Sequence, residues 1–194
     1  MLDILIFLAQ TADRKITAGY NADAHVRQLI IENADEIRHD VFRDNDPITF
    51  VDTGGESKPM QCVFVIWHGM LVACRISSLK CTVLSVCEGE WFGATTGAAV
   101  LQALEPVLEF LNAESQKPNL IFCDNKASCM LSSSNHTTKR MKHVARRLSF
   151  LQDLATANEI RLVHIKTEAN LADIGTKVLN VRTFHHLASF IWRP

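Results

Sequence analysis

The spacing of apolar residues changes along the chain from a strand pattern to a helix pattern. Residues 48–52 (ITFVD) form a short β-prone run that ends on Asp52. Residues 60–79 contain two apolar runs hinged near His68 and Gly69, which is typical of a β-hairpin. Residues 81–86 (CTVLSV) are predicted to add a further short strand. The first part of this region therefore favours antiparallel strands.

From Glu88 onward the apolar residues recur at helical spacing. A long helix is predicted here, and Pro106 should break it, kink it or start a second turn of it. The elements predicted after it are a strand at 119–124, an amphipathic helix at 137–157, a strand at 159–165, and helices at 168–179 and 182–192. The order of three strands, helix, strand, helix, strand, helix predicts an α/β fold. Its sheet is mixed, antiparallel in the first three strands and then parallel, with helices packed on it.

Residues 1–45 differ in character from the rest of the chain. A short apolar stretch at 4–9 leads into polar, acid-rich sequence with weak periodicity, and Pro47 follows it. We therefore interpret residues 1–45 as a connector and residues 46–194 as one domain.

The composition is that of an ordinary globular protein, with 47% hydrophobic and 21% charged residues. The net charge of −1 provides no overall attraction to nucleic acid, so any electrostatic contact with it must be local. No apolar run reaches membrane-spanning length and no signal peptide is recognised, which predicts a cytoplasmic or nuclear protein that is not secreted and has no membrane partner. The six cysteines form no C-x-x-C pair, which favours reduced core thiols.

Four acids fall at the ends of predicted elements. Asp52 and Asp124 close strands, whereas Glu90 and Asp173 lie near helix starts. Singly, each has a structural explanation as a turn residue or as an acid favoured at a helix start. Together they would repel one another, and divalent cations relieve such repulsion. Mg²⁺ prefers hard oxygen ligands, and two such ions can bind the attacking and leaving oxygens of a phosphodiester.

Four segments carry a resemblance to one family. FCDNKAS (122–128) resembles a Y-C-D-N-x-S-A motif, and EANLADIGTK (168–177) resembles D-x-L-A-D-I-L-T-K. SVCEGEW (85–91) is similar to S-S-T-E-A-E-Y, and KRMKHVARR (139–147) to R-T-K-H-I-D-x-R. These motifs resemble the RNase H domain of copia-type LTR retrotransposons over roughly residues 48–185. Residues 7–17 further resemble the segment that joins reverse transcriptase to RNase H in those polyproteins.

The resemblance implies an RNase H-like fold and a hydrolase that cleaves the RNA strand of RNA–DNA hybrids during retrotransposon replication. It implies that Asp52, Glu90, Asp124 and Asp173 are the catalytic residues and the ligands of two Mg²⁺ ions, for which Mn²⁺ could substitute. It also implies two partners, an RNA–DNA hybrid and the reverse transcriptase of the same polyprotein.

For two of these four acids, another acid of the chain is an alternative. Glu88 also stands near the helix start, but the family's A-E-Y acid aligns with Glu90 through Gly89 and Trp91. Asp23 lies in the segment GYNADA (19–24), which superficially resembles the family motif around its first acid. It is rejected because 90 − 23 = 67 residues is too long for one hairpin, whereas 90 − 52 = 38 fits.

The sequence departs from the family at Ala145, Ser149 and Gly175, which replace an aspartate, a histidine and a leucine of the motifs. These departures leave an alternative open: a catalytically inactive remnant of the fold that acts as a nucleic-acid-binding or interaction module. An integrase-like transferase on the same fold is a weaker alternative, because Asp173 fits the RNase H pattern better.

Basic residues gather in one segment of the chain. The residues assigned to nucleic-acid binding are Asn125, Lys139, Arg140, Lys142, Arg146 and Arg147. The five Lys and Arg residues of this set have two explanations. They form a solvated helix face, or they contact the phosphates of a hybrid duplex without reading its sequence. The sequence favours neither explanation.

Overall fold

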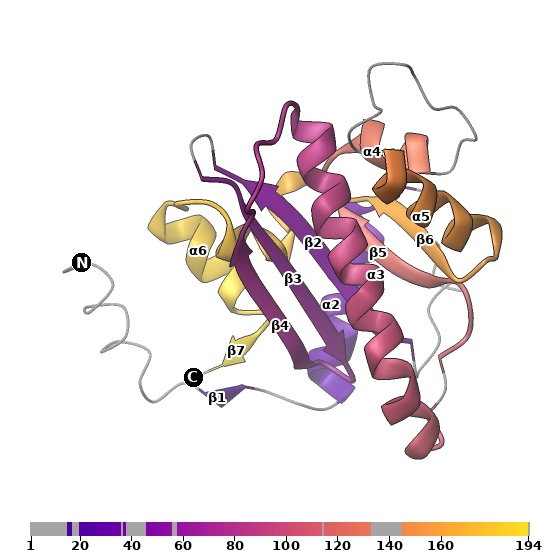
Figure 1. The fold of residues 1–194 in the computed structure, drawn as a ribbon. Coiled ribbons are helices and arrows are strands. Elements are labelled where there is room, and N and C mark those ends of the chain that lie inside the picture. Colours follow the sequence, from indigo (N-terminus) through magenta and orange to yellow (C-terminus); the bar gives the residue numbers. More distant parts are fainter. Residues whose placement is uncertain are drawn as a thin grey trace.

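The computed structural model describes residues 15–16, 20–35, 37, 46–55, 58–113, 115–132 and 145–193. At its centre is a five-stranded sheet with the strand order β4-β3-β2-β5-β6 (Figure 1). The strands are β2 (Ile48–Gly54), β3 (Met60–Trp67), β4 (Met70–Ser78), β5 (Asn119–Cys123) and β6 (Ile160–His164). Strands β2, β3 and β4 are antiparallel neighbours, whereas β5 is parallel to both β2 and β6. The expected mixed α/β sheet is confirmed.

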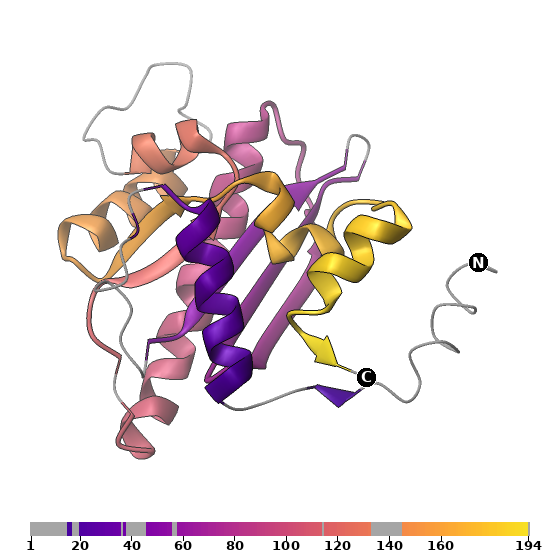
Figure 2. The same cartoon turned by 180° about the vertical axis from the view of Figure 1, so that it is seen from behind.

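Helices cover both faces of this sheet. The helical elements are α2 (Tyr20–Asn33), α3 (Val86–Phe110), α4 (Lys126–Ser132), α5 (Ala145–Thr156), the 3₁₀ turns η3 (Thr167–Ala169) and η4 (Leu171–Gly175), and α6 (Val181–Ala188). Helices α3, α4 and α5 lie on one side in Figure 1, and Figure 2 shows α2, the 3₁₀ turns and α6 on the other. A short pair of strands, β1 (Lys15–Ile16) and β7 (Trp192–Arg193), lies outside the main sheet.

Two local expectations were wrong, and a break at Pro106 is excluded. Residues 81–86 form no strand; they lead into α3, which begins after the N-cap residue Ser85. Pro106 does not end α3, because the helix continues to Phe110. The expected helix at 168–179 is instead the pair of 3₁₀ turns.

The persistence of α3 through Pro106 has a packing explanation. Proline removes one backbone hydrogen bond, but Pro106 is exposed, so water can solvate the freed carbonyl. Leu101 and Leu108, on either side of it in the sequence, are 2% and 6% exposed and hold both parts of the helix against the core. Of the amphipathic helix expected at 137–157, the structure describes 145–156 as α5, and residues 137–144 lie outside the described part of the chain.

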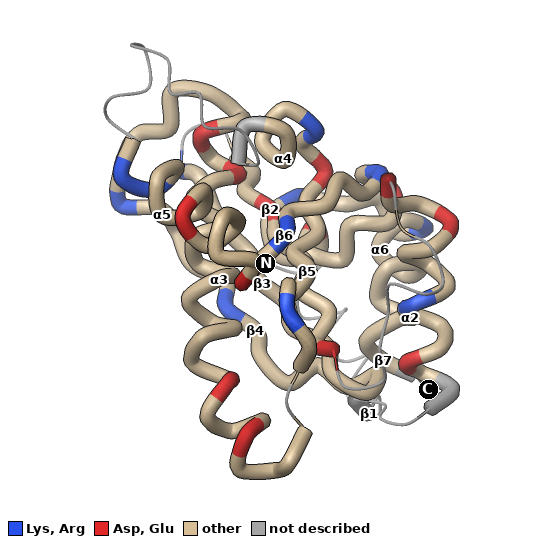
Figure 3. The backbone as a smooth tube through the Cα atoms, turned by 90° about the vertical axis from the view of Figure 1, so that its right-hand side faces the viewer, with Lys and Arg blue, Asp and Glu red and all other residues tan. Residues whose placement is uncertain are grey.

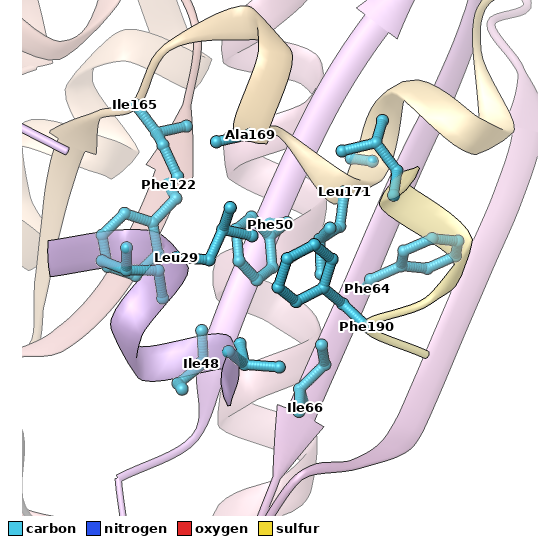
Figure 4. Close-up of a cluster of buried hydrophobic side chains, with 14 of the residues drawn as sticks. Leu29, Ile48, Phe50, Phe64, Ile66, Phe122, Ile165, Ala169, Leu171 and Phe190 are labelled. Carbon is cyan, nitrogen blue, oxygen red and sulfur yellow. The ribbon is translucent and has the colours of Figure 1, made fainter. Parts of the chain in front are cut away.

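Alternation along the strands creates two separate apolar cores. On β2, Phe50 faces the layer of α2 and the 3₁₀ turns, and its ring lies 5.6 Å from that of Phe122. Figure 4 shows this cluster, with Leu29 of α2 beside these rings. The next residue, Val51, packs in the other cluster with Trp91 of α3. The sheet is therefore buried on both faces.

Helix α2 belongs to the first of these cores. Val26 and Ile30 are fully buried, and the residue pair Ala34 and Ile165 forms an isolated antiparallel bridge next to the sheet. The division of the chain at residue 45 stays a prediction. However, the part of residues 1–45 that forms α2 supplies side chains to the core, which a simple connector would not do.

All six cysteines are free thiols. Cys62, Cys123 and Cys129 are buried, as expected for core residues, whereas Cys74 and Cys81 are exposed. In the part of the chain that the structure describes, no helix has both the length and the apolar character needed to cross a membrane.

Replacing Ile30 by alanine tests whether α2 is part of the folded core. Because Ile30 is 0% exposed, we expect Ile30→Ala to lower the free energy of unfolding by about 2–5 kcal/mol, the usual range for a buried isoleucine. Gln28→Ala changes an exposed position of the same helix and should stay within about 0.5 kcal/mol of the wild type. Urea denaturation measures both. Equal stability of the two variants would show that α2 is only a tether.

Candidate metal centre

Two neighbouring parallel strands bring the first pair of acids together. In the β2–β5 pairing Phe50 lies beside Phe122. Asp124 directly follows the last residue of β5, as expected, whereas Asp52 lies within β2, two residues before its end at Gly54, and does not close the strand. Parallel strands end at the same edge of a sheet, so both carboxylates lie at that edge. Asp52 is 1% exposed, whereas the Asp124 side chain is 11% exposed.

The third acid comes from the first turns of α3, where two glutamates have different roles. The Ser85 hydroxyl accepts a hydrogen bond from the Glu88 backbone N–H at 3.1 Å, and the Glu88 carboxylate accepts one from the Leu84 N–H at 2.8 Å. Glu88 is therefore a helix-capping residue. Glu90, only 2% exposed, is the glutamate whose carboxylate reaches the strand edge.

Glycines let α3 approach β2 closely enough for the Glu90 carboxylate to reach the strand edge. Gly89, Gly93 and Gly97 recur every four residues and therefore lie on one side of the helix. A Cβ atom on Gly97 would lie 2.9 Å from Cγ1 of Val51, which is closer than real side chains come. A larger residue at this position would force either the Val51 side chain or the helix that carries Glu90 to shift.

The three carboxylates converge. Each of Asp52, Glu90 and Asp124 offers an oxygen, and these atoms all lie within 4.8 Å of one another. Oε2 of Glu90 is buried and has no hydrogen-bond partner among the described residues. Burial, with the neighbouring carboxylates adding to it, raises the pKa of Glu90 well above its ordinary value and also raises the pKa of Asp52.

Asp173 lies beside this group but is not one of the three mutually close acids. It is 2% exposed in the 3₁₀ turn η4 and accepts a hydrogen bond from Nζ of Lys177 at 2.8 Å. Burial raises the pKa of Asp173 to about 7, even though Lys177 acts to lower it. The Thr176 hydroxyl donates a hydrogen bond to Oδ2 of Asp52, which ties the same turn to the strand edge.

Two residues fix the position of the turn that carries Asp173. The buried Asn170 side chain donates a hydrogen bond to the Val51 carbonyl at 3.0 Å and accepts one from the Ala172 N–H at 3.2 Å. At Gly175 a Cβ atom would lie 2.6 Å from Sγ and 2.9 Å from Cβ of Cys62. The glycine that departs from the family motif is therefore required here for close packing of the turn on β3.

The residues expected to bind nucleic acid are only partly described. Lys139, Arg140 and Lys142 lie outside the described residues. Arg146 is exposed on α5, whose basic positions appear blue in Figure 3, whereas the Arg147 guanidinium stacks 3.9 Å from the centre of the Phe92 ring. The side-chain oxygen of Asn125 accepts a hydrogen bond from the Ser128 N–H at 3.0 Å and so caps α4.

Lys177, Thr176 and Asn170 were present in the quoted motif but received no role from the sequence. Their spacing from Asp173 offered a signal, because residues three and four positions apart lie on the same side of a helix. Only the folded turn shows which of them contacts the acids.

The chain is similar in sequence to retrovirus-related Pol polyproteins of plant transposons. It is 30% identical over 112 residues to the retrovirus-related Pol polyprotein from transposon RE1 of Arabidopsis thaliana, an alignment that covers 58% of this chain and 8% of the relative. It is 26% identical over 145 residues to the corresponding polyprotein from transposon TNT 1-94 of Nicotiana tabacum, covering 71% of this chain and 11% of the relative. No protein-family model matches the chain. The chain thus spans about a tenth of the length of these curated relatives.

Solved structures with the same fold are RNase H domains. The N-terminal RNase H domain of a Mycobacterium tuberculosis protein, solved as a fusion with maltose-binding protein, superimposes with a TM-score of 0.53 at 14% identity and covers 74% of this chain and 96% of that one. RNase H1 of Halobacterium salinarum gives 0.53 at 10% identity, covering 68% and 94%. These comparisons confirm the expected RNase H-like fold and the relationship to retrotransposon polyproteins.

The raised pKa of Asp173 predicts an unusual dependence of stability on pH. Its carboxyl has a pKa of about 7 in the folded protein against an ordinary 3.8, so between about pH 4 and pH 7 the folded state binds more protons than the unfolded state. Stability therefore falls as the pH rises through this window. Asp52 and Glu90, also raised, act in the same direction.

We expect Asp173→Asn to flatten this decline in buffer containing a chelator, because the amide does not titrate. Asp153→Asn removes an exposed carboxyl of α5 and should leave the decline unchanged. Chemical denaturation at several pH values measures the slope for each protein. The same slope in Asp173→Asn and in the wild type would contradict the raised pKa.

Proposed function

We propose that this chain is a ribonuclease H-type endonuclease domain of a retrotransposon polyprotein, which hydrolyses the RNA strand of RNA–DNA hybrids with divalent metal ions. Its fold and its sequence relatives support this class of function. The observation that carries the proposal is the convergence of three buried or nearly buried carboxylates at one strand edge.

The donor set fits hard divalent cations. All the converging atoms are carboxylate oxygens, which Mg²⁺ and Mn²⁺ prefer. Oε2 of Glu90 is a buried acceptor without a hydrogen-bond donor among the described residues, and a cation would satisfy it. We propose that Asp52, Glu90, Asp124 and Asp173 hold two Mg²⁺ ions, for which Mn²⁺ substitutes.

Such ions supply a hydroxide nucleophile and stabilise the leaving oxygen of a phosphodiester. The protein's contribution is to fix the ligands before substrate arrives. Asp52 is held by the hydroxyl of Thr176, and the turn bearing Asp173 is held by Asn170. Ligands fixed in this way need little rearrangement during the reaction.

For the hybrid substrate, we propose that contacts to phosphates come from the basic residues at and before the start of α5. Arg146 is exposed there, and Arg147 is stacked on Phe92 of α3, the helix that also carries Glu90. Contacts of this kind position a duplex without reading its sequence. An A-form-like hybrid is then recognised by its geometry and its 2′-hydroxyl groups.

Glu90→Gln tests the site. The substitution preserves the size of the side chain but removes the buried charge that has no hydrogen-bond donor at Oε2. In the presence of chelator the variant should be at least as stable as the wild type, because like-charge repulsion is relieved. It should lose the rise in melting temperature that Mg²⁺ gives the wild type, since an ion stabilises only the state it binds. Cleavage of a labelled hybrid should fall about 100-fold or more.

Glu88→Gln is the matched control, because Glu88 lies two residues away on the same helix and caps it. This variant should retain the wild-type response to Mg²⁺ and the wild-type cleavage. Equal metal-induced shifts in the wild type and Glu90→Gln would refute the metal site. A metal response in the wild type without cleavage of hybrid would instead identify the inactive binding module.

A further inference from the structure

A single lysine contacts most of the acidic cluster. Nζ of Lys177 lies 2.8 Å from Oδ1 of Asp173, 3.3 Å from Oδ1 of Asp52 and 3.3 Å from Oδ2 of Asp124. If all four carboxylates are ionised, one ammonium leaves a net charge of 1 − 4 = −3 in this small volume. Burial of the lysine lowers its pKa, but the hydrogen bond to Asp173 and the other carboxylates raise it above the ordinary value.

We propose that Lys177 is a displaceable counter-ion, which holds the carboxylates together in the protein without divalent ions and leaves them when such ions bind. This inference rests on the proposed function, because it concerns the same four acids. It adds that the affinity of the site for metal is set by competition with a residue of the chain itself.

The competition follows from the atoms involved. The ammonium lies against carboxylates of Asp52 and Asp124, two of the three residues whose oxygens converge. An ammonium and a metal ion bound to the same carboxylates would share acceptor oxygens, and their positive charges would repel each other. Two divalent ions carry four positive charges and would neutralise all four carboxylates, since 4 − 4 = 0. The single charge of the lysine does not achieve this.

The structure also allows the lysine to leave. Its side chain is 33% exposed, and it is carried by a flexible stem of four carbons. The preceding turn is fixed independently through Asn170 and through the close packing of Gly175 on Cys62. The ammonium can therefore swing into solvent while Asp173 keeps its position.

Lys177→Met, which keeps an unbranched side chain only one atom shorter and removes its charge, tests the proposal. Isothermal titration with Mn²⁺ and with Mg²⁺ should show affinity about tenfold higher than in the wild type, because no charge competes. The melting temperature in chelator should fall, because the acids lose their cation, and the rise on adding metal should be larger than in the wild type. If the variant is unfolded in chelator, the Mn²⁺ concentration that restores its circular dichroism replaces the titration.

Lys117→Met is a matched control. Lys117 is 31% exposed, close to the value for Lys177, and it also bridges two acids, Glu105 and Glu159. Its replacement should leave metal affinity unchanged. Lys177→Arg, which keeps the charge, should restore the stability in chelator that Lys177→Met loses.

The outcomes separate the two proposals. Metal binding that is equally tight in the wild type and in Lys177→Met would overturn the role of Lys177 while leaving the metal site intact. Metal binding by neither protein would overturn the proposed function together with this inference. Binding by Lys177→Met alone would support the inference and show that the lysine keeps the wild-type site closed to metal.

Discussion

Repulsion between four carboxylates at one edge of the sheet is the constraint that the rest of this structure satisfies. Asp52, Glu90 and Asp173 are each at most 2% exposed, so water screens their charges poorly. Burial raises the pKa values of these three acids, and the neighbouring carboxylates add to the effect. The contacts of the Lys177 ammonium offset part of this repulsion, and the two apolar cores that fix the sheet and its helices supply the rest of the free energy that holds the acids together.

Close packing is the means by which the cores impose this geometry. The glycine side of α3 rests on Val51, and Gly175 lets the 3₁₀ turn rest on Cys62. Both contacts involve strands next to the acids, so a small displacement of either element would separate the carboxylates. Gly175 also shows that a departure from a family motif can be a packing requirement. Its replacement of leucine gives no evidence of decay.

Helix α2 gives part of the N-terminal segment a place in the packed core. Helix α2 lies over the sheet face that carries Phe50 and Phe122, and its residues Val26 and Ile30 are fully buried there. The chain corresponds to about a tenth of its polyprotein relatives, so neighbouring segments of a longer protein are part of the proposed context. Within the described residues, α2 packs as part of the domain that holds the acids.

The sequence by itself predicted the order of the five sheet strands and the long helix α3, and it singled out the four acids, because apolar periodicity and motif spacing are local properties. It also favoured Glu90 over Glu88, and the capping contacts of Glu88 now explain why only one of the two reaches the edge. Tertiary structure alone decided the contacts of Lys177, the need for Gly175 and the membership of α2 in the core. Each of these depends on contacts between residues far apart in the chain, as when Lys177 meets Asp52, and no local pattern encodes such a contact.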